Sequence, residues 1–178
     1  MSLMTAIEIA TRAHSGMWRD EQPALPYVTH VIEVVLNLRH VGQVTDLEML
    51  CAAALHDTVE TDSLSVGDIE KWFGSKVAAL VSELTRDEPS AIEIANLSKD
   101  EIWQLRADKL VSEISGMSAQ AQVIKLADRL ANVREAHRTK KGKKLKRYLG
   151  QTKQILSVVP RERNKFLWDA IHRELRKK

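Results

Sequence analysis

The sequence has little of what interrupts helices, cross-links chains or crosses membranes. Glycine and proline number only seven and four in 178 residues, so long segments run without a helix-breaking residue. The lone cysteine, Cys51, excludes an intrachain disulfide and favours a reducing compartment. No apolar run approaches the roughly 20 residues that span a bilayer, and Glu8 interrupts the segment where a secretory signal would lie. We therefore expect a cytoplasmic protein that does not associate with membranes.

Composition and residue spacing favour a single helical domain. Hydrophobic residues make up 44% of the chain and charged residues 29%, a balance that allows a buried core and disfavours disorder. Apolar residues recur at helical spacing nearly throughout, and no stretch shows the sustained alternation of a strand. The sequence therefore predicts one all-α domain over residues 1–178, with about eight to ten helices.

Glycine, proline and capping residues mark the ends of the expected helices. Pro23 and Pro26 predict a loop over 17–27, and Asp46 is a suitable N-cap for a helix that starts there. The other expected helices cover about 3–17, 29–40, 65–73, 75–85, 98–114, 118–137, 145–158 and 161–176. These helices divide the domain into a core over about 6–135, a basic loop over 138–147 and C-terminal helices over 145–177.

The positive charge is concentrated in one segment. Residues 138–147, RTKKGKKLKR, contain seven basic residues and no acidic one, and the rest of the chain carries 20 basic and 24 acidic residues. Such a segment can bind anions, including nucleic acid or a phosphorylated ligand. It can equally be a solvated, mobile loop between two helices. Only Tyr148 supplies an aromatic ring directly beside it, which disfavours binding of single-stranded nucleic acid by base stacking.

Two histidines and two aspartates are the residues best suited to carry chemistry. His56 and Asp57 are adjacent at the end of an apolar helix, CAAALHD. His30 lies upstream in PYVTH, and Asp128 lies downstream in IKLADRLANVRE. Two imidazoles and two carboxylates are a ligand set for one divalent metal ion that leaves positions for water and a substrate oxygen. A metal ion there would lower the pKa of bound water and polarise a phosphoryl oxygen.

Polar residues at helical spacing accompany these four. Glu60 follows His56 by four residues and shares its face if that helix continues. Lys125, Asp128 and Asn132 form one stripe on a later helix. Taken singly, each of these residues is also compatible with a structural role or with a solvent-facing helix surface. The stripe indicates chemistry only if it faces the two histidines.

Five segments, taken in order, resemble those of a known family. They read ATRAHSGMWRD, LPYVTHVIEV, LCAAALHDTVETD, IEKWFGSKVAALVSELTRDE and VIKLADRLANVRE, and the resemblance runs from about Ala6 to Arg134. They are similar to the HD superfamily of metal-dependent phosphohydrolases, and more narrowly to the hydrolase domain of RelA/SpoT enzymes and to stand-alone small alarmone hydrolases. The resemblance implies an all-α HD fold, one Mn²⁺ ion, and removal of the 3′-diphosphate from guanosine 3′,5′-bis(diphosphate), ppGpp.

The resemblance also implies roles for single residues. The metal ligands that it implies are His30, His56, Asp57 and Asp128. Glu60 matches the family's catalytic acid, which would orient or deprotonate the attacking water or pass a proton to the leaving group. The family usually has a second acid directly afterwards, but here Thr61 stands there and Asp62 is displaced by one residue. One residue turns a helical side chain by ~100°, so Asp62 is expected to act as that second catalytic acid only where the backbone is not helical.

Substrate contacts follow from the same resemblance. Arg19 lies where the family has a cation near the guanine base, on which a planar guanidinium can stack. Lys125 and Asn132 match positions that line the nucleotide, and Tyr148 matches a tyrosine that contacts it from a later helix. Asp20 stands where the family commonly has a second basic residue. This departure and Thr61 concern the substrate and leave the metal ligands intact.

Two other functions are compatible with the sequence. One is an HD phosphohydrolase of another nucleotide, for instance a nucleoside monophosphate, whose single phosphate needs fewer cations than two diphosphates do. The other is a catalytically weakened module that binds a nucleotide or, through residues 138–147, nucleic acid. The leading hypothesis is a Mn²⁺-dependent ppGpp 3′-pyrophosphohydrolase whose partner is a phosphorylated nucleotide.

Overall fold

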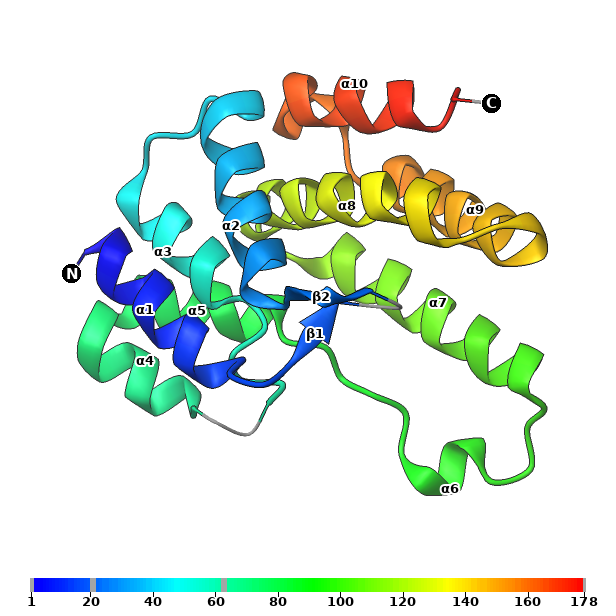
Figure 1. Cartoon of the computed structure of the whole chain (residues 1–178), viewed down its shortest axis with the longest axis horizontal. Coiled ribbons are helices and arrows are strands. Elements are labelled where there is room, and N and C mark those ends of the chain that lie inside the picture. Colours follow the sequence, from blue (N-terminus) through cyan, green and yellow to red (C-terminus); the bar gives the residue numbers. More distant parts are fainter. Residues whose placement is uncertain (1, 20–21, 62–63, 178) are drawn as a thin grey trace.

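Helices dominate the structure, a computed structural model that describes residues 2–19, 22–61 and 64–177 (Figure 1). Within these residues the α-helices are α1 (Leu3–Ala13), α2 (Val28–Leu36), α3 (Leu47–Leu55), α4 (Val66–Phe73), α5 (Ser75–Leu84), α6 (Ala91–Ile94), α7 (Lys99–Gly116), α8 (Ala119–Thr139), α9 (Gly142–Val158) and α10 (Lys165–Glu174). A π-helical turn, η1 (Asn37–Val41), extends α2, and a 3₁₀ turn, η2 (Arg161–Arg163), precedes α10. The predicted all-α class is confirmed.

Helix α8 is the central element of the core. Residues 121–131 of this helix are all buried, polar and apolar alike. The helix contacts α2, α5, α9 and α10 (Figure 1). A helix buried on every side must satisfy its polar side chains inside the protein. Three charged residues of α8, Lys125, Asp128 and Arg129, are under this constraint.

Helix α3 carries the His-Asp pair into this core. Asp46 caps the helix as predicted, because its carboxylate accepts hydrogen bonds from the backbone N–H groups of Glu48 and Met49. Every residue from Met49 to Leu55 is buried, and the run of three alanines within it allows close packing against α1 and α2. The helix ends at Leu55, and the buried His56 and the partly buried Asp57 follow it directly, at a position that the packing of α3 fixes.

The loop expected over 17–27 contains a short antiparallel hairpin. Strand β1 (Trp18–Arg19) pairs with β2 (Gln22–Pro26), and the register is irregular between Trp18 and Arg19. The prolines correctly indicated the absence of a helix. They are compatible with this two-stranded sheet because both strands are edge strands, where a missing N–H donor is tolerated.

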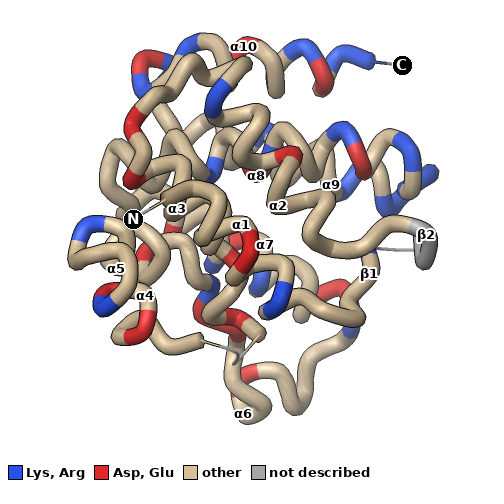
Figure 2. The backbone as a smooth tube through the Cα atoms, turned by 60° about the vertical axis from the view of Figure 1, so that its left-hand side comes forward, with Lys and Arg blue, Asp and Glu red and all other residues tan. Residues whose placement is uncertain are grey.

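The basic segment is mostly helical, so the prediction of a loop over 138–147 is wrong. Helix α8 continues to Thr139 and α9 begins at Gly142, whose φ of 54° allows the chain to turn between them. Leu145, Tyr148 and Leu149 are half-buried at helical spacing, and this amphipathic pattern extends α9 back into the lysine-rich residues. Figure 2 shows the resulting concentration of Lys and Arg at the start of α9.

No helix among the described residues is long and apolar enough to cross a membrane.

One further helix, α6, was not expected from the sequence, and its N-terminus is fixed by a capping box between Ser90 and Glu93. Its four residues lie in the connection between α5 and α7. That the whole chain forms one domain stays a prediction, which the packing of α10 against α8 supports.

Candidate functional site

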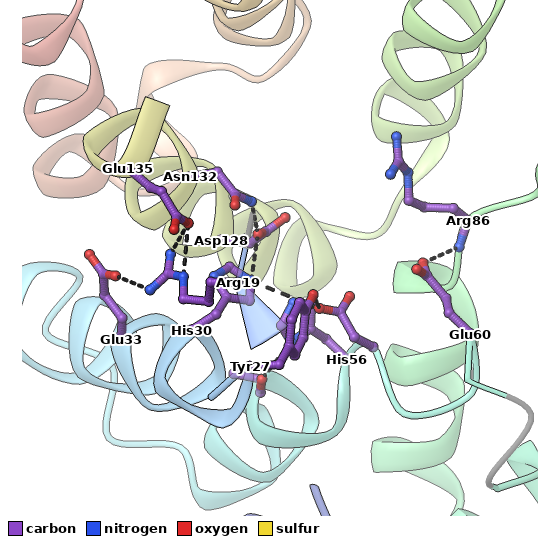
Figure 3. A network of polar contacts seen from close by, with 12 residues as sticks. Arg19, Tyr27, His30, Glu33, His56, Glu60, Arg86, Asp128, Asn132 and Glu135 are labelled. Carbon is purple, nitrogen blue, oxygen red and sulfur yellow. Dashed lines mark hydrogen bonds and ion pairs between the residues drawn. The ribbon is translucent and has the colours of Figure 1, made fainter. Parts of the chain in front are cut away.

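Three elements bring the two histidines and two aspartates together. His30 comes from α2, Asp128 from α8, and the adjacent His56 and Asp57 from the turn after α3 (Figure 3). Nε2 of His30 lies 3.3 Å from Oδ1 of Asp128 and 3.8 Å from Oδ2 of Asp57. Ligand atoms of His30, His56 and Asp128 all lie within 4.8 Å of one another, which is compatible with a single bound cation. We call these four residues the His/Asp centre.

The hydrogen bonding of His56 indicates that the centre takes a cation. Its Nδ1 lies 2.9 Å from the carbonyl oxygen of Ala53, and because a carbonyl only accepts, Nδ1 carries a proton. In the neutral ring Nε2 is then an acceptor, yet it lies 3.0 Å from the carboxylate oxygen Oδ2 of Asp57. Two electron-rich atoms so placed need a positive charge near both of them. A proton on the ring or a metal ion supplies it, and the imidazole and carboxylate donors suit a divalent transition metal.

Both carboxylates of the centre stay ionised. Burial opposes ionisation, but the neighbouring His56 ring holds the pKa of Asp57 below its usual range. Lys125, whose Nζ lies 3.1 Å from Oδ2 of Asp128, likewise holds the pKa of Asp128 well below its usual range against the effect of burial. Ionised carboxylates are the protonation state that metal ligands require, and a bound metal ion would take the place of the proton on the His56 ring.

A cavity of about 220 Å³ opens beside the His/Asp centre. It is lined by Tyr27, His30, Asp57, Glu60, Arg86, Leu110, Lys125, Asp128, Arg129, Asn132, Tyr148 and Gln151. Carboxylates and three cationic side chains share its wall. A phosphorylated ligand with a metal ion at its reacting phosphate therefore finds charges of both signs there.

Glu60 and Arg86 form the mouth of the cavity, where both residues are exposed. The chain forms turns after Leu55, so α3 does not continue to Glu60 as the same-face argument assumed. The backbone N–H of Arg86 instead fixes Glu60, donating to Oε1 at 3.0 Å (Figure 3). Desolvation, and next the Asp57 charge, raise the pKa of the Glu60 carboxyl, which brings it nearer to the neutral range in which a proton is exchanged.

The stripe on α8 faces the histidines and not solvent. Lys125 is buried, and Nδ2 of Asn132 donates to Oδ1 of Asp128. Tyr148 enters the cavity from α9, and its ring lies 4.9 Å from the guanidinium carbon of Arg129. The structure thus brings these predicted substrate-binding residues to one wall. Their contacts with a nucleotide stay predictions.

Arg19 is held away from the cavity lining by two carboxylates. Its side chain is buried and donates to Glu135 through Nε at 2.8 Å and to Glu33 through Nη1 at 3.1 Å (Figure 3). These bonds fasten β1 to α2 and α8. Stacking of Arg19 on a base stays a prediction, and the structure gives the residue a further, stabilising role.

Replacing Arg19 by glutamine is expected to lower the free energy of unfolding by about 3 kcal/mol, because two partly buried carboxylates lose their shared cation. Urea unfolding followed by circular dichroism measures this. The control is Arg12→Gln, since Arg12 makes an exposed 4.0 Å pair with Glu8 that contributes little. Equal stability of Arg19→Gln and wild type would contradict the role of Arg19 as a clamp.

Two expectations from the sequence remain, one for Asp62 as a second catalytic acid and one for the basic segment 138–147 as a nucleic-acid binding site. Asp62, the displaced second acid, lies outside the described residues. In the basic segment, Lys143 and Arg147 both pair with Asp100 of α7, at 3.1 Å and 2.6 Å, so part of its charge is compensated. Nucleic-acid binding through this segment stays a prediction.

Sequence reasoning missed several residues that line the cavity. They are Tyr27, Arg86, Leu110 and Gln151, whereas Arg129 was among the residues expected to supply positive charge to the phosphates. Tyr27 precedes His30 by three residues, and that spacing was the available signal that both face one way. Arg86 lies in one of the five segments that resemble the family, but no role was expected for it, and it reaches the site through the path of the connection between α5 and α6.

Comparison with known proteins gives one consistent result. Residues 6–159 match the HD domain family. The chain is 35% identical over 136 residues to guanosine-3′,5′-bis(diphosphate) 3′-pyrophosphohydrolase MESH1 of Homo sapiens, covering 76% of this chain and 70% of that protein. The Danio rerio protein of the same name is 34% identical over 136 residues, covering 76% and 69%.

A solved structure resembles the whole fold. It is that of a metazoan ortholog of SpoT that hydrolyses ppGpp and plays a role in starvation responses. It superposes with a TM-score of 0.82 at 30% sequence identity, and the match covers 98% of this chain and 93% of the other. The likeness therefore includes the C-terminal helices as well as the elements that carry the His/Asp centre.

Proposed function

The chain belongs to the HD domain family and is a phosphohydrolase, and from this premise we propose that it removes the 3′-diphosphate of ppGpp. The observation that carries the proposal is the buried His/Asp centre beside a cavity lined by Arg86, Lys125 and Arg129. Relatives named for this reaction cover three quarters of the chain and support the choice of substrate.

A divalent metal ion is the cofactor, and we propose Mn²⁺. His30, His56, Asp57 and Asp128 would hold it, and their mixed nitrogen and oxygen donors suit this ion. When bound, the metal supplies a lowered pKa for a water molecule and polarisation of a phosphoryl oxygen.

The residues of the chain have distinct parts in the proposed reaction. Glu60, at the mouth of the cavity, accepts a proton from the attacking water or returns one to the 3′-oxygen of the departing GDP. Lys125 presents a buried positive charge to the reacting phosphate while it compensates Asp128. Asn132 fixes the orientation of Asp128. Tyr148, braced by Arg129, contacts the nucleoside.

Hydrolysis of ppGpp by the purified protein tests the proposal. With Mn²⁺ present, release of pyrophosphate and GDP is expected, and EDTA is expected to stop it. A panel of nucleoside mono-, di- and triphosphates run in parallel tests the alternative substrates. Turnover of a monophosphate without turnover of ppGpp would overturn the substrate assignment and leave the phosphohydrolase class intact.

Tyr27 is expected to tune metal affinity. Its hydroxyl donates to Oδ2 of Asp57 at 2.6 Å, and its ring is packed against His14 and His30, so it fixes the orientation of that carboxylate. Tyr27→Phe removes only the hydroxyl and is expected to weaken Mn²⁺ binding about 10-fold, as for other losses of a hydrogen bond to a ligand. Isothermal titration calorimetry measures this. Tyr148→Phe removes a hydroxyl that also lines the cavity but makes no hydrogen bond to Asp57 in the described structure, so it should bind Mn²⁺ like wild type. Equal affinity of both variants would contradict the role of Tyr27.

A further inference from the structure

The three cations that line the cavity differ in how far protein groups already compensate them. Lys125 is 5% exposed and pairs with Asp128 at 3.1 Å. Arg129 is also 5% exposed, donates to Oε1 of Gln151 at 3.2 Å and lies against the ring of Tyr148. Both charges are therefore deep in the wall and engaged with protein groups.

Arg86 differs from both. It is exposed at the mouth, and its guanidinium, unlike the side chains of Lys125 and Arg129, makes neither a hydrogen bond nor an ion pair in the part of the chain that the structure describes. The acidic residues that follow it are taken by other cations, since Asp87 pairs with Lys109 at 2.7 Å and Glu88 with Arg106 at 2.8 Å. Arg86 therefore presents to the cavity a positive charge that no described carboxylate pairs with.

Arg86 also fixes the position of the Glu60 carboxylate at the mouth of the cavity. Its backbone N–H donates to Glu60, while its guanidinium points away from that carboxylate (Figure 3). A phosphate that reached the mouth would be repelled by Glu60 unless a cation stood beside it. A guanidinium offers two parallel N–H donors to a phosphate, which adds geometric selection to charge.

We propose that Arg86 binds the outer phosphate of a diphosphate whose inner phosphate lies at the His/Asp centre. It thereby selects diphosphate groups over single phosphates. The proposal rests on the proposed function in placing the reacting phosphate at that centre. In this arrangement the second phosphate of a diphosphate extends from the buried centre toward the exposed Arg86, and a single phosphate bound at the centre has no group that does so.

Direct binding of inorganic pyrophosphate and inorganic phosphate tests the proposal without any nucleotide. The measurement is titration calorimetry on the Mn²⁺-loaded protein. The Arg86→Gln variant is expected to bind pyrophosphate about 10-fold more weakly than wild type does and to bind phosphate with the same affinity as wild type. Arg86→Lys should recover part of the loss, because it keeps the charge and loses the paired donors. Arg106→Gln is the matched control, since that exposed arginine pairs with Glu88 outside the cavity.

Two results would overturn the proposal. Equal weakening of pyrophosphate and phosphate would make Arg86 a general electrostatic contributor, and unchanged pyrophosphate binding would remove it from the site. Failure of ppGpp hydrolysis alone would leave the binding result standing, so the two proposals fail separately. If ppGpp is hydrolysed, Arg86→Gln should raise KM about 10-fold and change kcat little, because the backbone N–H that fixes Glu60 is retained.

Discussion

Replacing Asp57 by alanine is expected to abolish metal binding and to reduce ppGpp turnover at least ~10³-fold, because a metal centre contributes several kcal/mol to stabilising the transition state. The carboxylate lies 3.0 Å from His56 and 3.8 Å from His30. Its removal takes one candidate ligand from the set and leaves the hydroxyl of Tyr27 without its acceptor. Metal content by mass spectrometry and turnover by pyrophosphate release measure the two effects.

Thermal unfolding separates loss of metal from loss of fold. A ligand that binds only the folded state stabilises it, so EDTA should lower the Tm of the wild type and leave that of Asp57→Ala unchanged. The control variant is Asp87→Ala, an exposed aspartate that pairs with Lys109 and lies outside the His/Asp centre. An Asp57→Ala protein with full metal content and full activity would remove Asp57 from the ligand set.

Glu60→Gln is the second large effect, with kcat expected to fall by ~10²-fold or more as for loss of a positioned acid or base. The glutamine keeps an oxygen that accepts from the backbone N–H of Arg86, so the side chain stays in place. Metal content should not change, because Glu60 lies at the mouth of the cavity and outside the His/Asp centre. Steady-state kinetics together with metal analysis distinguish this variant from Asp57→Ala.

The pH dependence of kcat distinguishes a catalytic role of Glu60 from a purely structural one. The raised pKa of Glu60 means that its carboxylate gains a proton at a higher pH than an ordinary glutamate does. If the carboxylate acts as a base, wild-type kcat falls as pH decreases through that pKa. The kcat of Glu60→Gln should not show this decrease at low pH. Glu88→Gln, which changes an exposed glutamate paired with Arg106, should keep both the rate and the decrease at low pH. An unchanged rate in Glu60→Gln would exclude Glu60 from the mechanism.

Local sequence patterns predicted most of the helices. Three- and four-residue spacing of apolar side chains, with caps such as Asp46, gave α3, α4, α5, α7 and α8 close to their ends in the structure. The hairpin at 18–26 and the helical start of α9 were missed. Strand β1 has two residues and β2 has five, two of them prolines, so neither carries a clear periodic signal. The lysine-rich residues of α9 become helical because half-buried neighbours such as Tyr148 anchor them against the core.

The sequence by itself determined the chemistry that is available and the family to which the chain belongs. An ordered set of motifs supplies two histidines, two aspartates and a nearby glutamate, and no folding is needed to see that these residue types suit a metal-dependent hydrolase. That information is local, since each motif occupies a few consecutive residues.

The tertiary structure alone decided which of the many charges are free to act. Arg19 meets Glu135 across 116 residues of sequence and is neutralised, and Lys125 is compensated by Asp128. The guanidinium of Arg86 lies at the cavity without an ion-pair partner among the described residues. Coulombic attraction between side chains falls off with spatial distance, not with separation in sequence, so only the folded path of the chain assigns each cation a protein partner or leaves it for a ligand.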